Sequence, residues 1–242
     1  MTSDIPALRV ALVVEGPTDY AMLQAIVAHL AHPRPVTFSF VQPEFSAAFE
    51  QISDEGGWGG VYRWCRSTVD LHGPNGLEDN LLFLNHDLLI LQIDADVAAS
   101  NYTAAHIDEA VHDLPCATSC PPISATANAL ANVVLRWLDI NANPAKLVLC
   151  IPAQSLEAWI LAGLYPTDRQ VRGGTLECRP KPERQLASKP LNGRLVSGDK
   201  KSLSAYRMRA NELAQSWQEV VQACSQARQF EQRFVAAIPG ST

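Results

Sequence analysis

The chain lacks several features that would place it in a common class. No apolar run approaches the ~18–20 residues that span a bilayer, and the polar start Met1–Asp4 has neither the basic nor the apolar region of a signal peptide. There is no Walker motif, no HExxH motif and no Cys-x-x-Cys pair. These absences argue against a membrane span, an exported protein and a built-in ATPase, so we expect a cytoplasmic protein.

Six cysteines are scattered along the chain, at positions 65, 116, 120, 150, 178 and 224. The only close pair is Cys116 and Cys120, and no second half-site follows it to complete a zinc site with nearby His112. Several of the cysteines lie in apolar contexts. We therefore expect reduced, partly buried thiols.

Composition predicts a folded chain with uneven charge. Of the 242 residues, 47% are apolar and 18% charged, which is enough apolar surface for a sizeable core. Residues 1–150 carry 6 basic and 17 acidic side chains, whereas residues 151–242 carry 13 and 8. An acidic part joined to a basic part suggests a metal on one side and a polyanion on the other, with plain solvated surface as the alternative.

Two short apolar runs each end in acidic residues. Leu8–Val14 leads into Glu15–Asp19, and Leu88–Ile93 leads into Asp94–Asp96. Runs of this kind are typical of buried parallel strands, and ligands of open α/β sheets bind at the carboxyl ends of the strands. The acidic side chains are therefore expected to meet at one edge of a sheet.

Strands alternate with helices along the chain. Beyond the two runs above, the pattern predicts strands over 36–41 and 146–151. It predicts helices over 20–30, 45–52, 61–71, 77–84, 103–114, 124–138, 155–164, 203–224 and 226–236, with Ser124 capping its helix. Residues 54–60 are expected to form a flexible loop, and residues 165–200 a long basic segment with little regular structure. The fold class is α/β: a mainly parallel sheet with helices on both faces, plus a C-terminal helical extension.

Four carboxylates are candidate metal ligands, namely Glu15, Asp19, Asp94 and Asp96. Gathered at one sheet edge, they would repel one another unless a cation lay between them, and Mg²⁺ prefers such oxygen ligands. They could hold one ion, or two at ~3.5–4 Å separation. The alternative for each acid alone is a helix cap or a surface charge.

The order of these motifs resembles a known family. Val14–Asp19 followed by Ile93–Asp96 resembles the Toprim domain of topoisomerases, primases and several nucleases, which places a Glu and a DxD motif around Mg²⁺. The further acid Asp19 resembles OLD-type nucleases and the small stand-alone Toprim-like proteins of bacterial defence systems. The resemblance implies a Toprim-like fold and bound Mg²⁺ or Mn²⁺, one or two ions.

A third segment, Leu149–Ile160, resembles the strand and helix start of the stand-alone members. On that likeness Glu157 is a candidate second-metal ligand, with a first-turn helix acid as the equal alternative. The resemblance implies a catalytic domain over 1–165, with an insertion at 56–85. Residues 166–242 would then form a basic loop and C-terminal helices packed on that domain.

Basic residues of the second half are candidate phosphate contacts. A cation near the transferring phosphate would assist catalysis, and Lys200 and Lys201 are the best local candidates beside the catalytic acids Glu15, Asp94 and Asp96. The candidates for nucleic-acid binding are Arg194, Lys200, Lys201, Arg207 and Arg209. Surface solubility is the alternative for each of them alone.

These features together predict a divalent-metal-dependent nuclease that cleaves DNA or RNA, in antiphage defence. Because the chain has no Walker motif, an ATPase would have to be a separate partner; a homo-oligomer is a further alternative. Leu89–Val97 also resembles the nucleophile motif of haloacid-dehalogenase-type phosphatases, with Asp94 as nucleophile, although Glu15–Asp19 would then be unexplained. The last alternative is a non-catalytic Toprim-like subunit that binds a partner.

Overall fold

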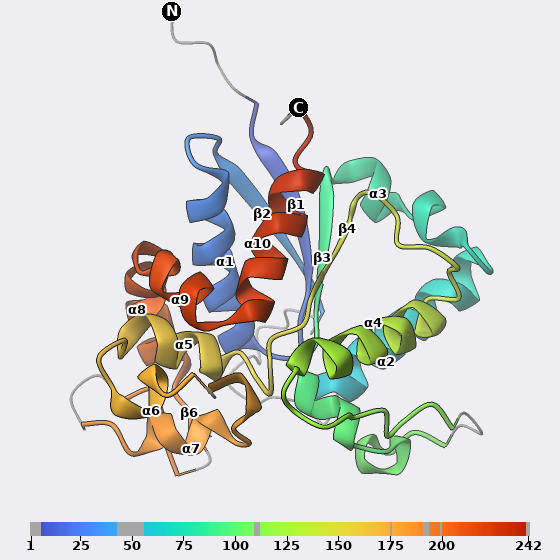
Figure 1. Cartoon of the computed structure of the whole chain (residues 1–242). Coiled ribbons are helices and arrows are strands. Elements are labelled where there is room, and N and C mark those ends of the chain that lie inside the picture. Colours follow the sequence, from blue (N-terminus) through green and yellow to red (C-terminus); the bar gives the residue numbers. More distant parts are fainter. Residues whose placement is uncertain are drawn as a thin grey trace, which may run out of the picture.

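A parallel β-sheet forms the centre of the protein in the computed structural model (Figure 1). The structure describes residues 6–42, 56–108, 112–174, 176–190, 194–198 and 200–240. The strands of this sheet are β1 (Leu8–Val13), β2 (Val36–Gln42), β3 (Leu88–Gln92) and β4 (Leu147–Cys150). They pair in the order β2-β1-β3-β4, and each neighbouring pair is parallel. The predicted α/β class with a parallel sheet is confirmed.

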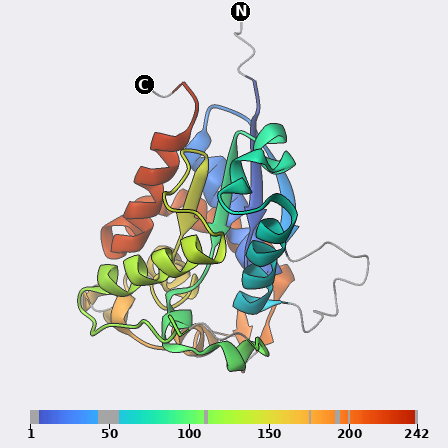
Figure 2. The same cartoon turned by 90° about the vertical axis from the view of Figure 1, so that its right-hand side faces the viewer.

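Helices cover both faces of the sheet, as Figures 1 and 2 show. One face carries α1 (Pro17–Ala31), α5 (Glu157–Leu164), α8 (Leu203–Gln215), α9 (Trp217–Ala223) and α10 (Ser225–Ala237). The other carries α2 (Gly57–His72), α3 (Leu81–Asn85) and α4 (Ile123–Trp137). Val10 and Leu12 of β1 enter the first core, whereas Ala11 and Val13 enter the second. Because both faces of β1 are buried from Val10 onward, its sequence is continuously apolar after the exposed Arg9.

The predicted flexible loop over 54–60 is wrong for its last four residues. Gly57–Gly60 form the first turn of α2, while the rest of that loop except Gly56, and the helix predicted over 45–52, lie outside the described residues. A side-chain Cβ at Gly59 would lie 3.0 Å from the Cβ of Ala105, so a glycine there lets α2 pack closely on its neighbour. Gly59 therefore serves close packing rather than flexibility.

Three helix predictions of the middle region need correction. The helix predicted over 77–84 is two short pieces, the 3₁₀ helix η1 (Gly76–Asp79) and α3, because the Asn80 side chain accepts a hydrogen bond from Leu82 N at 2.9 Å and starts a new helix. Within the described part of 103–114, only the 3₁₀ helix η3 (Tyr102–Ala105) forms, and His106 follows it with a positive φ of 55°. Helix α4 begins before Ser124, with Pro122 as its N-cap residue.

The segment 165–200 is more ordered than its composition suggests. Its described part contains α6 (Arg169–Arg172), the 3₁₀ helix η4 (Leu176–Cys178), α7 (Pro182–Ala187) and the hairpin strands β5 (Val196–Ser197) and β6 (Lys200–Lys201). Isolated apolar side chains anchor these pieces in the core: Leu176, Leu186, Leu195 and Val196. Elements of two to six residues are too short to produce a periodic pattern, which is why the prediction missed them.

The C-terminal helices pack on the face of the sheet that α1 and α5 cover. Trp159 of α5 contacts Trp217 of α9 edge to face, with ring centroids 5.5 Å apart, and both side chains are fully buried. The single helix predicted over 203–224 is divided at Ser216 into α8 and α9. In the described part of the chain, no helix has both the length and the apolar character needed to cross a membrane.

Gly163 of α5 lies at a close approach between this helix and the C-terminal helices. A Cβ at this position would lie 2.6 Å from Leu213 Cδ1 and 2.9 Å from Val220 Cγ2, and both neighbours are fully buried. We expect Gly163→Ala to destabilise the protein by about 1–3 kcal/mol, because two packed side chains would have to move. Urea denaturation would measure the change, and an unaltered unfolding midpoint would contradict this packing.

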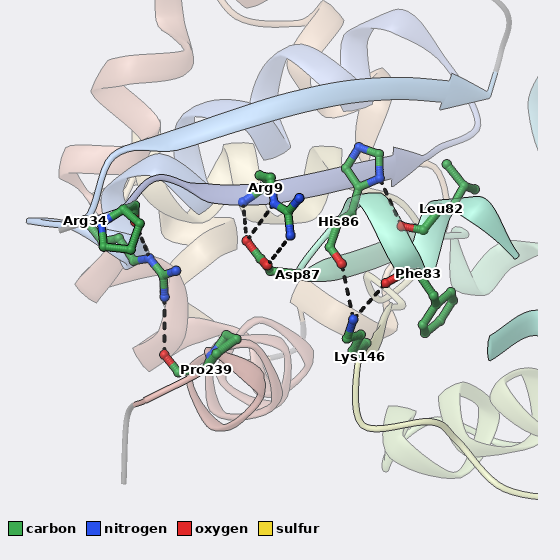
Figure 3. Close-up of polar contacts among 9 residues, drawn as sticks. Arg9, Arg34, Leu82, Phe83, His86, Asp87, Lys146 and Pro239 are labelled. Atoms are coloured by element: carbon green, nitrogen blue, oxygen red, sulfur yellow. Dashed lines mark hydrogen bonds and ion pairs between the residues drawn. The ribbon is translucent and has the colours of Figure 1, made fainter. Parts of the chain in front are cut away.

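Polar contacts join the amino ends of the strands, at the edge opposite the acidic motifs (Figure 3). Arg9 forms an ion pair with Asp87, at 2.9 Å between Nη2 and Oδ1. Lys146 donates to the carbonyl of Phe83 at 2.7 Å, and Arg34 donates to the carbonyl of Pro239 at 3.2 Å. These contacts bring the starts of β1, β3 and β4 and the C-terminal end of α10 together.

The expectation of six reduced cysteines is wrong for two of them. Cys120 and Cys178 form a disulfide, with their Cα atoms 5.5 Å apart although 58 residues separate them in sequence. The bond joins the loop before α4 to η4, two segments that only the folded chain brings together. The other four cysteines are free thiols, of which Cys65, Cys150 and Cys224 are buried.

Reduction of this disulfide is expected to lower the free energy of unfolding. A cross-link across 58 residues restricts the unfolded chain, and a loop of this length corresponds to about 4 kcal/mol in the chain-entropy model. We expect a lower unfolding midpoint for Cys120→Ser and for wild type with excess dithiol. The control is Cys116→Ser, since Cys116 is half-buried and free; equal midpoints for the two variants would contradict the expectation.

Candidate functional site

The two acidic motifs meet at the carboxyl ends of β1 and β3. These strands are direct neighbours, with Val13 opposite Leu91, so the residues that follow them lie side by side. The backbone N–H of Asp94 donates to Glu15 Oε1 at 2.7 Å. Residues separated by 79 positions in sequence are thus in contact, the Glu15 side chain with the Asp94 backbone, at the edge where the strand ends were predicted to meet.

Gln92 connects the two motifs and was not predicted. Its Nε2 donates to Asp94 Oδ1 at 2.8 Å, while its Oε1 accepts from the backbone N–H of Glu15 at 3.0 Å. Gln92 is fully buried and is the one polar residue within the apolar run Leu88–Ile93. That isolated polar side chain was the signal in the sequence, because a buried amide needs partners in the fold.

The loop after β4 completes the arrangement around the second motif. Backbone N–H groups of Ala95 and Asp96 donate to the carbonyls of Pro152 and Gln154 at 2.9 and 3.0 Å. Asp94 Oδ1 also accepts from the N–H of Leu156 at 3.2 Å, directly before α5. These bonds hold the start of α5, and with it Glu157, beside the DxD motif.

Asp19 lies in the first turn of α1, after Gly16 and Pro17. Its side chain is buried, and among the described residues its Oδ1 has no hydrogen-bond partner. Burial raises the pKa of Asp19 to about 6, a rise that Lys201 opposes and Glu157 adds to. A buried carboxylate oxygen without a partner is costly, and such an atom points to a ligand that completes it.

Glu157, at the first position of α5, is buried and fully engaged by protein donors. Ser155 Oγ donates to its Oε2 at 2.6 Å, and Tyr206 OH donates to its Oε1 at 2.7 Å. Lys201 Nζ lies 2.7 Å from the same Oε1. Burial favours the protonated form, but Lys201 and these hydrogen bonds outweigh it and leave the pKa below its ordinary value. Ser155 and Tyr206 were not predicted, and no pattern in the sequence marks Tyr206.

The two adjacent lysines of β6 differ in position. Lys201 reaches into the carboxylate cluster, with about a third of its side chain exposed, at 34%. Burial lowers its pKa, but Asp19, Glu157 and Asp94 together raise it well above the ordinary value, so its ammonium is charged. Lys200 precedes it on the same hairpin, is exposed, and pairs in the β-ladder with Ser197.

Burial and mutual repulsion raise the pKa values of the remaining carboxylates. Burial raises the pKa of Glu15 to about 8, opposed by its hydrogen bond with Asp94 and reinforced by Asp19 and Asp96. The pKa of Asp94 is also raised, first by burial and then by Glu15. Asp96 lies at the exposed rim of the cluster. Desolvation of its carboxylate by the surrounding protein raises its pKa to about 6, and repulsion from Glu183 of α7 raises it further. Glu183 is a further acid near the site, contributed by the basic segment.

The other predicted phosphate contacts are not gathered around the carboxylates. Arg194 donates through Nη2 to the carbonyl of Lys189 at 3.0 Å. Arg209 pairs with Glu212 on α8, at 2.9 Å between Nη2 and Oε1. Arg207 is exposed on the same helix. The structure thus brings Glu15, Asp19, Asp94, Asp96, Glu157 and Lys201 together. No hydrogen bond or ion pair in the described part of the chain joins Lys200, Arg194, Arg207 or Arg209 to these carboxylates.

The donors of this site fit a hard divalent cation in chemistry. All of its acidic groups are carboxylates, the oxygen donors that Mg²⁺ and Mn²⁺ accept, and Asp19 Oδ1 is a buried oxygen without a partner. In the described part of the chain, no group of three or more His, Cys, Asp or Glu side chains stands ready to enclose a metal ion. Several carboxylate oxygens instead contact protein donors, so binding an ion would require side chains to turn.

Comparison with known proteins finds no matching family model, no matching curated protein and no matching solved structure. The chemistry of this site therefore has to be argued from the chain itself.

Proposed function

We propose that this protein is a Mg²⁺- or Mn²⁺-dependent nuclease of Toprim-like type, which hydrolyses phosphodiester bonds of DNA or RNA. The observation that carries the proposal is the direct contact between the two acidic motifs: Asp94 N–H to Glu15 Oε1, with Gln92 bonded to both residues. The unpartnered oxygen of Asp19 supports it. Burying several carboxylates next to one another costs free energy, and a bound cation would offset that cost.

The residues of the site would have three roles: binding the cation, positioning its ligands and stabilising charge on the phosphate. Glu15, Asp94, Asp96 and Asp19 would hold the cation, which when bound supplies an activated water and offsets charge on the phosphate. Gln92 would keep Glu15 and Asp94 in their relative position through its two hydrogen bonds. Lys201, a charged ammonium at the rim of the cluster, would stabilise negative charge on the transferring phosphate.

The proposal includes the setting that the sequence suggests. A nuclease of this kind would act in antiphage defence in the cytoplasm, and Arg207, Arg209, Arg194 and Lys200 would contact the nucleic-acid backbone away from the metal. Any ATP-dependent control would come from a partner ATPase. In a reducing cytoplasm the Cys120–Cys178 bond would be exposed to cellular dithiols, which makes its state in cells part of this proposal.

A cleavage assay tests the proposed function. Supercoiled plasmid, single-stranded DNA and RNA would each be incubated with the protein in Mg²⁺, in Mn²⁺ and in EDTA. We expect metal-dependent cleavage of at least one substrate, which Glu15→Gln abolishes and Glu219→Gln, at an exposed acid of α9, leaves intact. Cleavage that persists in EDTA, or in Glu15→Gln at the wild-type rate, would remove the proposal.

The same assay separates the alternatives. A phosphatase of the haloacid-dehalogenase type would transfer the phosphoryl group of a phosphate ester to the Asp94 carboxylate, releasing the alcohol and forming an aspartyl-phosphate (acyl phosphate) that mass spectrometry can detect. A non-catalytic subunit would cleave none of the substrates with any metal. Either result would replace the nuclease assignment.

A further inference from the structure

Lys201 is a cation that the chain itself places among the acidic side chains. Its ammonium contacts Glu157 Oε1 at 2.7 Å and interacts electrostatically with Asp19 and Asp94. It therefore lies where the end of β3 and the starts of α1 and α5 face one another. In a site with five carboxylates, this is the position at which a second metal ion would also have to bind.

The backbone fixes Lys201 in this position. Val196 pairs with Lys201 in the β5–β6 hairpin, and both Val196 and Leu195 are buried in the core. Ser202, the next residue, donates to the carbonyl of Leu195 at 2.9 Å and starts α8. The hairpin before Lys201 and the helix after it thus fix the backbone on both sides of this residue. The position of Lys201 in the cluster therefore follows from the fold.

Glu157, the acid that would serve a second ion, has no free oxygen in this arrangement. Oε2 accepts from Ser155, and Oε1 accepts from both Tyr206 and Lys201. Tyr206 lies on the same segment as Lys201, one turn into α8. A divalent ion on Glu157 would have to displace the ammonium or lie against it, and two such cations at close range repel strongly.

The acids that make no direct contact with Lys201 remain for a metal. Asp19 Oδ1 is buried and has no partner among the described residues, and its charge acts on both Glu15 and Asp94, which contact each other at the strand ends. We propose that this site takes one divalent cation, held by Glu15, Asp19 and Asp94 with Asp96 at the rim, and that the Lys201 ammonium replaces the second. This inference rests on the proposed function and decides its metal count.

Counting bound Mn²⁺ tests the inference without reference to activity. Equilibrium dialysis or electron paramagnetic resonance of free Mn²⁺ is expected to give one tight ion per wild-type chain. Lys201→Ala should gain a second ion, because it removes the ammonium from Glu157 and leaves only the neutral hydroxyl donors Ser155 and Tyr206 there, and the double variant Lys201→Ala/Glu157→Gln should return to one. The matched control is Lys200→Ala, which removes the exposed lysine of the same hairpin and should keep one ion.

The outcomes separate the inference from the function it rests on. Two tight ions in wild type, or one ion in a folded Lys201→Ala, would overturn the inference while metal-dependent cleavage could still stand. No Mn²⁺ binding and no cleavage by wild type would overturn the proposed function itself. If Lys201→Ala does not fold, Lys201→Gln keeps a hydrogen-bond donor for Glu157 without the charge, and the same gain of a second ion is expected.

Discussion

Asp94→Asn is expected to make the metal-free protein more stable and at the same time to abolish metal binding and cleavage. Asp94 is buried, and its charge is opposed by burial and by Glu15, Asp19 and Glu157. The asparagine keeps Oδ1 as the acceptor for Gln92 and Leu156 N–H, so the local structure is preserved. Removal of the charge alone should raise the free energy of unfolding at pH 8 by about 1–3 kcal/mol.

The functional loss from the same substitution should be large. An amide oxygen is a neutral and weaker ligand for a hard cation than a carboxylate, and Asp94 lies at the centre of the cluster. We expect a fall in the cleavage rate of about 10³-fold or more, comparable to the removal of a key electrostatic group. A substitution that raises stability but lowers activity identifies Asp94 as a ligand. An acid with only a structural role would lose stability when it is replaced.

Thermal unfolding in EDTA, Mn²⁺ titration and the cleavage assay would measure the three quantities together. Asp79→Asn is the matched control, because Asp79 is an exposed acid of η1. It should change none of them appreciably. A less stable Asp94→Asn protein that still bound Mn²⁺ with wild-type affinity would contradict the role assigned to Asp94.

Metal affinity should rise steeply with pH, up to about pH 8. The pKa of Glu15 is raised to about 8 and those of Asp19 and Asp96 to about 6, so a cation that binds these groups has to displace protons. With one proton displaced from Glu15, Mn²⁺ association should increase about tenfold per pH unit between pH 6 and 8. Isothermal titration at pH 6, 7 and 8 would measure this slope.

Stability without metal should change in the opposite direction. The folded state keeps protons on these acids at pH values where the unfolded chain has lost them, so the free energy of unfolding falls as pH rises from about 4 to 8. The pKa of Glu157 is lowered, so its contribution to the free energy of unfolding rises with pH only below the ordinary pKa of a glutamate. That change lies outside this window. The unfolding temperature in EDTA should therefore be lower at pH 8 than at pH 5.

Glu15→Gln provides the control for both slopes. It removes the group that titrates near pH 8 and the charge that adds to the raised pKa of Asp94, so the unfolding temperature in EDTA should fall less between pH 7 and 8 than that of wild type. Saturating Mn²⁺ should raise the wild-type unfolding temperature more at pH 8 than at pH 6, by ligand linkage. A wild-type stability that increases between pH 5 and 8 would show that the buried carboxylates are not protonated as inferred.

The carboxylate site was largely predictable because it depends on strand ends. Buried parallel strands are continuous apolar runs, and their carboxyl ends share one sheet edge, so Glu15 and Asp94 were expected to meet before the fold was known. Their contact in the structure agrees with this expectation. Gln92, within one of those runs, carried a signal that could have been used in the same way.

Other parts of the site depend on contacts that no local pattern records. Of two adjacent lysines with the same chemistry, only Lys201 enters the cluster, because the pairing of β5 with β6 directs it there. Tyr206 reaches Glu157 because α8 packs beside α1 and α5. The Cys120–Cys178 bond likewise depends on two loops that lie 58 residues apart in sequence.

The sequence by itself determined the layered α/β architecture and the acidic edge, since both follow from short-range patterns: apolar runs, helical periodicity and the residue that ends each run. Only the tertiary structure decided which cation lies among the acids, which oxygens are already engaged and which cysteines are bonded. Those outcomes depend on the packing of segments distant in the chain, and the free energy of such packing is not encoded at any single position.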